Sequence, residues 1–285
     1  MIVAERAADV RQAVHDAHRR TLSVGCVPTM GALHAGHVSL IEAARRECRF
    51  TAVTIFVNPT QFGPHEDFTR YPRPLENDLE LCRQAGVDLV FAPRAETLYP
   101  PGFGTFVDVE PLAQVLEGAF RPGHFRGVAT VVLKLLNIVQ PDAAYFGRKD
   151  FQQQLLIRKM CRDLDLAVEI RTCPTVREPG GLALSSRNRF LAGGDRQKAL
   201  VLSQALLLAE RRLQAGEQDV QTVCAEMRRH MESARGVAVD YATVADPETL
   251  VELAVPIADM VALVAARVGS TRLIDNLVLS LERPS

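Results

Sequence analysis

The sequence predicts an α/β protein built on a doubly wound parallel sheet, followed by a smaller C-terminal α+β domain. Strand-like and helix-like patterns alternate through the first two-thirds of the 285 residues, which favours parallel strands joined by right-handed helical crossovers. Residues 51–57, Thr-Ala-Val-Thr-Ile-Phe-Val, are nearly continuously apolar, as expected for a strand that helices cover on both faces. After residue 176 the alternation stops, and we expect a second unit there.

The N-terminal elements are predicted from apolar runs and from helical spacing of apolar residues. The predicted strands are 23–27, 51–57, 88–91, 143–146 and 167–171, and the predicted helices are 3–19, 37–48, 75–86, 127–139 and 150–163. Pro74 precedes helix 75–86 and Gly86 closes it, as is typical of helix starts and ends. We therefore assign residues 1–176 to a Rossmann-like domain, whose ligands should bind beyond the carboxyl ends of the strands.

The C-terminal part has a different pattern. Residues 177–181, Arg-Glu-Pro-Gly-Gly, are typical of a turn-rich hinge. Helices are predicted over 194–215 and 218–233, and strands near 237–244, 260–266 and 272–279. This order predicts a smaller α+β domain over 177–285.

Composition excludes several classes of protein. The net charge of −1 gives no overall attraction to nucleic acid or to an anionic membrane. The six cysteines are scattered without a Cys-x-x-Cys pair, which indicates reduced thiols and a cytoplasmic protein. We expect neither a secretory signal nor a membrane span, because the first residues lack an apolar core and no long apolar run follows.

The most informative motif is residues 27–37, Val-Pro-Thr-Met-Gly-Ala-Leu-His-Ala-Gly-His, which joins a buried strand to a helix. Backbone N–H groups at a helix N-terminus point one way and favour an anion. Gly31 and Gly36 allow a phosphate to approach the backbone closely, and His34 and His37 can donate hydrogen bonds to developing charge. Two ordinary capping or surface histidines are the alternative. A metal site would need a third ligand, and none stands at a recognisable spacing.

A second motif, residues 56–63, reads Phe-Val-Asn-Pro-Thr-Gln-Phe-Gly. It places polar Asn58 and Gln61 just after a buried strand, where a ligand pocket is expected. The alternative is a turn at Asn58 and Pro59 followed by a solvated loop.

A third motif, residues 144–154, reads Ala-Tyr-Phe-Gly-Arg-Lys-Asp-Phe-Gln-Gln-Gln. Lys149 can place a positive charge on a phosphate, and Asp150 can cap the helix or bind ribose hydroxyls or a metal. Gln153 follows Lys149 by four residues, so we expect both on one helix face. A capped helix with a solvated lysine is the alternative.

Two basic loops complete the set. Residues 181–189, Gly-Leu-Ala-Leu-Ser-Ser-Arg-Asn-Arg, bring two hydroxyls and a guanidinium together in Ser185, Ser186 and Arg187, which can wrap a polyphosphate. A flexible polar linker is the alternative there. Residues 121–127, Arg-Pro-Gly-His-Phe-Arg-Gly, can face an anion or merely connect two elements.

In order and position, these motifs resemble those of the adenylate-forming nucleotidyltransferases. In that superfamily His-x-Gly-His follows the first strand, and a Lys-Met-Ser-Lys-Ser type of loop, to which Leu184-Ser185-Ser186-Arg187 is similar, follows the last. Four motifs together resemble the pantothenate synthetase (pantoate–β-alanine ligase) family: Pro-Thr-Met-Gly-Ala-Leu-His-x-Gly-His, Ile-Phe-Val-Asn-Pro-x-Gln-Phe, Gly-x-Lys-Asp-x-Gln-Gln and Leu-Ser-Ser-Arg-Asn. The resemblance runs from about residue 20 to the end of the chain.

The resemblance implies a ligase that forms a C–N bond. Such an enzyme condenses (R)-pantoate with β-alanine to pantothenate, a coenzyme A precursor, through a pantoyl adenylate, and releases AMP and pyrophosphate. Mg²⁺ would accompany the phosphates of ATP, with no metal ligand expected from the protein. The resemblance also implies a homodimer whose substrates are the small molecules ATP, pantoate and β-alanine.

Carried over residue by residue, the resemblance implies catalytic roles for His34, His37 and Lys149. Gln61 and Gln153 would bind pantoate, and Gln61 would also bind β-alanine. The implied ATP-binding residues are Met30, Gly31, Ala32, Leu33, His34, Ala35, Gly36, His37, Gly147, Arg148, Lys149, Asp150, Val176, Leu184, Ser185, Ser186 and Arg187.

Two positions depart from the family pattern. Arg148 stands where the family usually has Glu, which adds positive charge beside Lys149 and puts the local salt-bridge pattern in doubt. Leu184 stands where many members have Met, a volume-conserving change that should matter little.

Two rival functions are weighed against this one. A transferase that moves AMP or CMP to a phosphorylated acceptor would need more cationic side chains to bind the acceptor's phosphate, and the neutral pair Gln61 and Gln153 argues against it. A catalytically silent nucleotide-binding module would not need both histidines, Lys149 and the Ser-Ser-Arg loop.

Overall fold

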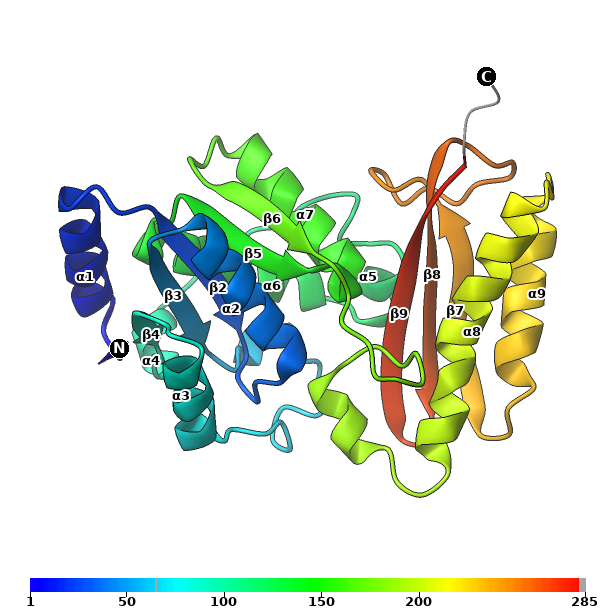
Figure 1. The fold of residues 1–285 in the computed structure, drawn as a ribbon, viewed down its shortest axis with the longest axis horizontal. Helices are drawn as coiled ribbons and strands as arrows, with labels where there is room; N and C mark the ends of the chain where they lie inside the picture. Colours follow the sequence, from blue (N-terminus) through cyan, green and yellow to red (C-terminus); the bar gives the residue numbers. More distant parts are fainter. Residues whose placement is uncertain (65, 282–285) are drawn as a thin grey trace. The chain divides into compact units, whose positions relative to one another are not determined.

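The computed structural model describes residues 1–64 and 66–281, and its elements are labelled in Figure 1. The chain divides into two compact units. The first contains Met1–Arg148 and Gln152–Pro174, and the second contains Lys149–Phe151 together with the chain from Thr175 onward. The switch of units at Thr175 lies next to the hinge predicted at 177–181, whereas the separate grouping of Lys149–Phe151 was not predicted from the sequence.

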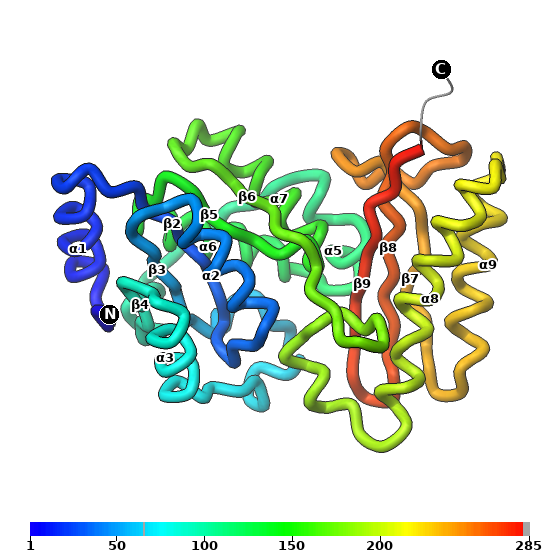
Figure 2. Tube along the Cα trace, in the orientation of Figure 1, coloured from blue at the N-terminus to red at the C-terminus, as the bar shows by residue number. Residues whose placement is uncertain are grey.

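The first unit is built on a six-stranded parallel sheet in the order β1-β4-β3-β2-β5-β6. The strands are β1 (Ile2–Ala4), β2 (Val24–Thr29), β3 (Phe50–Ile55), β4 (Leu89–Phe91), β5 (Ala143–Gly147) and β6 (Glu169–Cys173), and Figure 2 traces the chain through them. The chain runs outward from β2 to β3 and β4, then returns to the other side of β2 for β5 and β6. The loops after β2 and β5 therefore leave the sheet at its topological switch point, where ligands bind in such sheets.

Helices alternate with these strands along the chain. They are α1 (Ala7–Arg19), α2 (Ala35–Glu47), α3 (Leu75–Gln84), α4 (Ala95–Leu98), α5 (Glu117–Phe120), α6 (His124–Val139) and α7 (Phe151–Asp163), with 3₁₀ helices η1 (Pro59–Gln61) and η2 (Arg148–Asp150). Helices α1, α2 and α6 contact the strands of the sheet. The fold class predicted from the sequence is confirmed. Each long predicted helix is present, with ends shifted by a few residues.

The apolar run of the central strands explains their burial. Successive residues of a strand point to opposite faces, and the neighbours Cys26 and Val27 of β2 are both fully buried. Val27 joins Ile41 of α2 and Leu79 of α3 in one core. Burying a side chain of this size contributes roughly 1.5–3 kcal/mol, so packing of α2 and α3 in this core stabilises the sheet.

Three local expectations were wrong. Residues 2–4 form the short strand β1 and not the start of a helix, because Ile2 pairs with Leu89 along β4. Helix α6 begins at His124, ahead of the predicted 127, after Gly123 adopts a left-handed φ of 80°. Lys149 lies in η2 and not in the helix that begins at Phe151, so the four-residue spacing to Gln153 is not a spacing along one α-helix.

The second unit carries a three-stranded antiparallel sheet in the order β7-β8-β9. Its elements are the 3₁₀ helix η3 (Ser186–Phe190), α8 (Asp195–Gln214), α9 (Val220–Glu232), β7 (Val237–Ala245), β8 (Asp259–Val268) and β9 (Thr271–Ser280). Leu206 of α8, Met231 of α9 and Val264 of β8 share one buried core. The smaller α+β unit predicted from the sequence is thus present.

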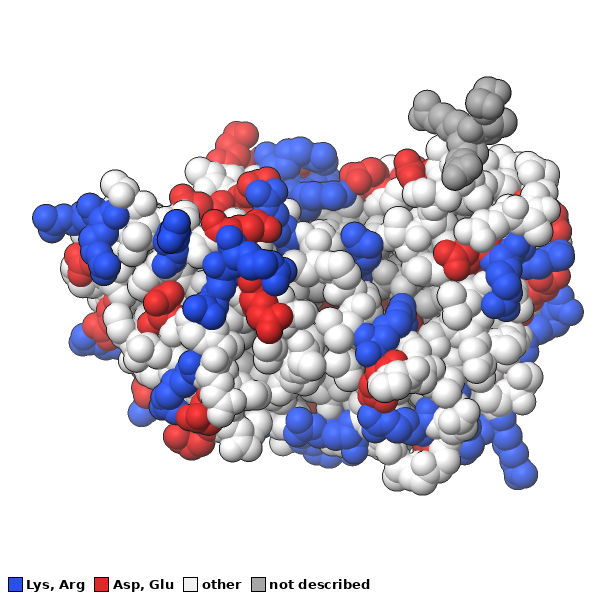
Figure 3. Space-filling model, in the orientation of Figure 1, with Lys and Arg blue, Asp and Glu red and all other residues white. Residues whose placement is uncertain are grey.

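The charge distribution agrees with the composition. Basic and acidic side chains are interspersed on the face shown in Figure 3, as the net charge of −1 suggests. Within residues 1–64 and 66–281, none of the helices combines the length and apolar character that a membrane crossing requires.

Candidate active site

A buried carboxylate holds the loop that follows β2. Asp78 of α3 is 2% exposed, and its two oxygens accept hydrogen bonds from the backbone N–H groups of Ala32 (2.8 Å) and Leu33 (2.7 Å). Gly31 and Ala32 have left-handed φ values of 78° and 50°. A Cβ on Gly31 would lie 2.8 Å from Asp78 Oδ2, so glycine is required here. Asp78 carries no motif signal, and sequence reasoning missed it.

The two histidines begin helix α2. His34 is the N-cap, and its Nδ1 accepts from the backbone N–H of Gly36 at 3.1 Å. His37 Nδ1 accepts from the backbone N–H of His34 at 3.3 Å, and the ring centroids lie 4.1 Å apart. A neutral imidazole that accepts at Nδ1 carries its proton on Nε2. The capping alternative is therefore right for His34, whose Nδ1 caps the helix N-terminus while its proton lies on Nε2.

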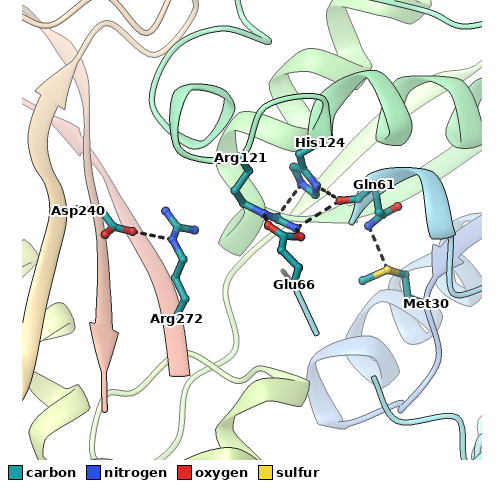
Figure 4. Close-up of polar contacts among 7 residues, drawn as sticks. All are labelled: Met30, Gln61, Glu66, Arg121, His124, Asp240 and Arg272. Atoms are coloured by element: carbon teal, nitrogen blue, oxygen red, sulfur yellow. Dashed lines mark hydrogen bonds and ion pairs between the residues drawn. The ribbon is translucent and has the colours of Figure 1, made fainter. Parts of the chain in front are cut away.

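Gln61 is held in a buried network. It is 7% exposed, and Asn58 is 1% exposed, which rules out a solvated loop. Asn58 Nδ2 donates to Gln61 Oε1 (3.0 Å) and to the carbonyl of Gly127 (3.1 Å). Gln61 Nε2 donates to Met30 Sδ at 3.0 Å, as Figure 4 shows. A Cβ on Gly127 would lie 2.4 Å from the carbonyl oxygen of Thr60. Helix α6 thus packs directly on the backbone of η1 and fixes the amide of Gln61.

The loop of residues 121–127 contacts the backbone carbonyl of Gln61. Arg121 binds Glu66 through two hydrogen bonds of 2.7 Å and donates to His124 Nε2 at 3.0 Å. His124 therefore keeps its proton on Nδ1, which donates to the backbone carbonyl of Gln61 at 2.9 Å (Figure 4). Burial and the nearby Arg121 charge lower the pKa of His124 to about 4, so the ring is neutral at pH 7.

Glu66 keeps its charge in this cluster. Burial raises the pKa of Glu66, but the hydrogen bonds and the charge of Arg121 outweigh that effect, and the net shift is downward. The guanidinium of Arg121 is thus matched by an ionised carboxylate. Of the two interpretations left open for this loop, the structure favours a connecting and bracing one.

The three consecutive glutamines of α7 differ in their surroundings. Gln152 is buried; its amide donates to the carbonyls of Leu112 (2.7 Å) and Val115 (2.8 Å) and accepts from the N–H of Glu117 (3.1 Å). Gln154 accepts from the hydroxyl of Thr172 at 3.0 Å. Gln153 is half-buried and makes no side-chain hydrogen bond with the residues that the structure describes. Gln153 is the glutamine of the three that can turn to a ligand.

The segment after β5 exposes backbone and charge. Nothing lies within 4 Å of a Cβ built on Gly147, which leaves room for a ligand against the backbone. Arg148, Lys149 and Asp150 form η2, and Lys149 Nζ lies 3.4 Å from Asp150 Oδ1. The Lys149 side chain is 19% exposed and that of Asp150 is 47% exposed. Both can therefore still meet a solvent-borne ligand.

The Ser-Ser-Arg loop is an ordered structure within the second unit. Arg177 pairs with Ala183, and the backbone N–H of Leu184 donates to the carbonyl of Val176 at 2.9 Å. Ser185 caps η3 by accepting from the N–H of Arg187 at 3.2 Å. Val176, Leu184 and the residues 185–187 thus lie together. These hydrogen bonds argue against a flexible linker.

The structure brings the candidate residues together in two sets. Residues 30–37 and Gln61 belong to the first unit, with Met30 touching Gln61 directly. Lys149, Asp150, Val176 and residues 184–187 belong to the second unit. Among the described residues, no group of three His, Cys, Asp or Glu side chains could hold a metal ion.

Comparison with known proteins extends this picture. Residues 2–278 match the family model described as pantoate-beta-alanine ligase. Pantothenate synthetase 1 of Bradyrhizobium diazoefficiens is 53% identical, over 98% of this chain and 99% of that protein. Pantothenate synthetase of Moorella thermoacetica is also 53% identical, over 95% of this chain and 96% of its own length.

Solved structures agree. The crystal structure of pantothenate synthetase from Thermus thermophilus has a TM-score of 0.93 and 48% identity, covering 97% of this chain and 99% of that one. Pantoate-beta-alanine ligase from Francisella tularensis, complexed with beta-gamma ATP and beta-alanine, has a TM-score of 0.80 and 34% identity, covering 98% and 97%. The fold, the motifs and these comparisons together show that the chain belongs to the pantoate–β-alanine ligase family.

Proposed function

We propose that this chain joins (R)-pantoate to β-alanine and forms pantothenate, using ATP and releasing AMP and pyrophosphate. Membership of the family supports the overall reaction. The observation that carries the chemistry is the histidine pair at the N-terminus of α2, since both rings accept at Nδ1, carry their protons on Nε2 and lie at a helix end that favours an anion.

The reaction runs in two steps. A carboxylate is a poor electrophile, so a carboxylate oxygen of pantoate first attacks the α-phosphorus of ATP, and the bond from that phosphorus to the pyrophosphate oxygen breaks. The amine of β-alanine then attacks the carbonyl carbon of the pantoyl adenylate, the amide bond forms, AMP leaves and the amine loses a proton. Shielding the adenylate from water prevents its hydrolysis.

The residues contribute mainly by positioning and by electrostatic stabilisation. His34, His37 and Lys149 stabilise charge on the phosphates, which is largest as the α-phosphorus is attacked. Gln153 and Gln61 bind pantoate, and Gln61 also meets β-alanine. The buried hydrogen bonds from Asn58 and to Met30 support this role, because they hold the Gln61 amide in one orientation.

The nucleotide would contact the backbone of residues 30–37 and of Gly147. Nothing lies within 4 Å of a Cβ built on Gly147, which leaves room for a ligand there. Asp150 would lie near the ribose, and Arg148, Val176, Leu184, Ser185, Ser186 and Arg187 would complete the ATP site. In this proposal residues 1–176 form the nucleotide- and pantoate-binding domain and residues 177–285 the lid.

Mg²⁺ would enter with ATP and neutralise phosphate charge. An ion bound in this way takes most of its oxygens from phosphates and water. We also expect a cytoplasmic protein, because its scattered cysteines indicate reduced thiols, and a homodimer, as the family resemblance implies. Sedimentation equilibrium at micromolar concentration would test the dimer.

Pyrophosphate exchange tests the proposed function. Labelled pyrophosphate should enter ATP when pantoate is present without β-alanine, and AMP should accumulate only after β-alanine is added. Exchange with another acid from a panel, and none with pantoate, would overturn the assignment. His37→Ala and Lys149→Ala should each lower the exchange rate on the order of a hundredfold, as lost transition-state donors do; a folded variant with a near-wild-type rate would refute the role of that residue.

A further inference from the structure

Lys149 is tied to strand β9 through its backbone. The buried side chain of Asn276, which is 3% exposed, donates from Nδ2 to the carbonyl oxygen of Lys149 at 2.7 Å. Both residues lie in the second unit, because the segment Lys149–Phe151 is grouped with the chain from Thr175 onward. The hydrogen bond therefore sets where the backbone of Lys149 lies against β9.

Asp275, the residue before Asn276, binds a second segment, the turn that begins at Arg177. Asp275 is 4% exposed, and its carboxylate accepts two hydrogen bonds from Arg177, at 2.6 Å and 3.0 Å. Arg177 also donates to the carbonyls of Gly181 (3.0 Å) and Asn276 (3.2 Å). An ion pair with this many hydrogen bonds and a buried carboxylate holds the turn of residues 177–183 against β9.

That turn leads directly into the Ser-Ser-Arg loop. The Arg177–Ala183 pair closes it, and Asn188 of η3 donates to the carbonyl of Ala183 at 3.0 Å and to Glu178 Oε1 at 3.0 Å. Hence the backbone of residues 184–187 follows the position of Arg177.

Strand geometry explains how neighbours serve two segments. Adjacent residues of a strand point to opposite faces. Asp275 and Asn276 pair with Val264 and Leu263 in the middle of the β8–β9 ladder, which makes β9 a stiff reference. Reacting groups misplaced by about 1 Å can cost roughly a hundredfold in rate, so two loops that grip one triphosphate need a common reference.

We infer that Asp275 and Asn276 are positioning residues that set Lys149 and the Ser185–Arg187 loop in fixed places relative to each other. The inference rests on the proposed function for the roles of these two segments. It assigns neither residue a contact with substrate. Their sequence signal, an Asp-Asn pair within an apolar strand, belongs to none of the four motifs that resemble the family.

Chemical labelling of lysine amines measures how accessible the Lys149 side chain is, independently of catalytic turnover. The chain has four lysines, at positions 134, 149, 159 and 198, so labelling of each can be followed by mass spectrometry. Asn276→Ala should raise labelling of Lys149 relative to Lys198 by roughly fivefold, the factor that one lost hydrogen bond corresponds to. Asn276→Asp, which keeps the shape and removes the donor, should do the same if the alanine variant folds poorly.

The matched control breaks a different polar contact in the same sheet. Arg272 of β9 and Asp240 of β7 form an ion pair at 2.6 Å with side chains 15% and 16% exposed (Figure 4). Asp240→Asn should lower the melting temperature but leave Lys149 labelling and pyrophosphate exchange near wild type. Asn276→Ala should lower kcat for exchange by roughly ten- to a hundredfold, with a smaller change in KM for ATP.

Trypsin tests Asp275 in the same way. Asp275→Asn should speed cleavage of the native protein after Arg187 or Arg189, and Asp240→Asn should not. The inference is wrong if Asn276→Ala matches Asp240→Asn in Lys149 labelling and in kcat, or if Asp275→Asn leaves cleavage unchanged. A fully active Lys149→Ala would instead refute the proposed role of Lys149, and the labelling result would still decide whether Asn276 holds that segment.

Discussion

The carboxylate of Asp78 should control both stability and the shape of the histidine loop. It accepts two backbone hydrogen bonds, from Ala32 and Leu33, and is almost fully buried. A hydrogen bond to a charged group contributes about 1.5–3 kcal/mol. Asp78→Asn keeps one acceptor oxygen and turns an NH₂ group toward the second N–H, so we expect a loss of about 2–3 kcal/mol from the free energy of unfolding. That is a large part of the roughly 5–15 kcal/mol typical of a whole domain.

The assay pairs urea unfolding with pyrophosphate exchange. Because the loop backbone would shift beneath His34, exchange should fall by about a hundredfold. Asp88→Asn is the control, since Asp88 also accepts one backbone N–H, that of Thr51, at 2.8 Å, but at the amino ends of β3 and β4. It should cost about 1–3 kcal/mol in stability and leave exchange unchanged. The role of Asp78 is refuted if Asp78→Asn loses no stability, or loses it while exchanging as fast as Asp88→Asn.

Other side chains of the site give three further predictions. His34→Asn and His37→Gln keep residue types suited to the N-cap and third helical position, so stability should change by about 1 kcal/mol or less while exchange drops on the order of a hundredfold; wild-type rates in both would mean that the histidines only cap. Gln152→Ala should lower the free energy of unfolding by about 2–4 kcal/mol through its three hydrogen bonds, whereas Gln153→Ala should leave stability intact and raise KM for pantoate, and the reverse pattern would contradict the assignment. The pKa of His124 lies near 4 in the folded protein and near 6.5 when unperturbed, so the unfolded chain binds more protons between these pH values. The free energy of unfolding is therefore unaffected by His124 above pH 6.5 and falls by on the order of 3 kcal/mol as the pH drops toward about 4. His124→Gln should remove this dependence of the free energy of unfolding on pH from urea-unfolding data, and an unchanged dependence would show that other groups cause it.

The sequence predicted most of the fold because burial patterns are local. The apolar run at 51–57 predicts β3, and the helical spacing of apolar residues after His37 predicts α2. Strand β1 was missed because three residues are too few for a period, and its pairing with β4 depends on chain far away. The start of α7 was misplaced because η2 continues the helical direction with a different hydrogen-bond pattern.

The site was predictable only as far as its motifs reached. Gln61 could be singled out by its neighbours in sequence, but Asp78 is 46 positions from Ala32 and Asn276 is 127 positions from Lys149. Contacts between residues so far apart in the sequence produce no recognisable spacing between them. The run Gln152 to Gln154 likewise cannot reveal which amide is buried, since that depends on residues 112–117 packing against it.

The most direct test of the central claim follows one oxygen atom. If the carboxylate of pantoate attacks the α-phosphorus of ATP, one of its oxygens stays with the phosphorus when the amide forms. Pantoate labelled with ¹⁸O in the carboxylate should then yield AMP carrying one ¹⁸O atom and unlabelled pyrophosphate. Label in pyrophosphate or inorganic phosphate, or AMP without label, would contradict activation through an adenylate.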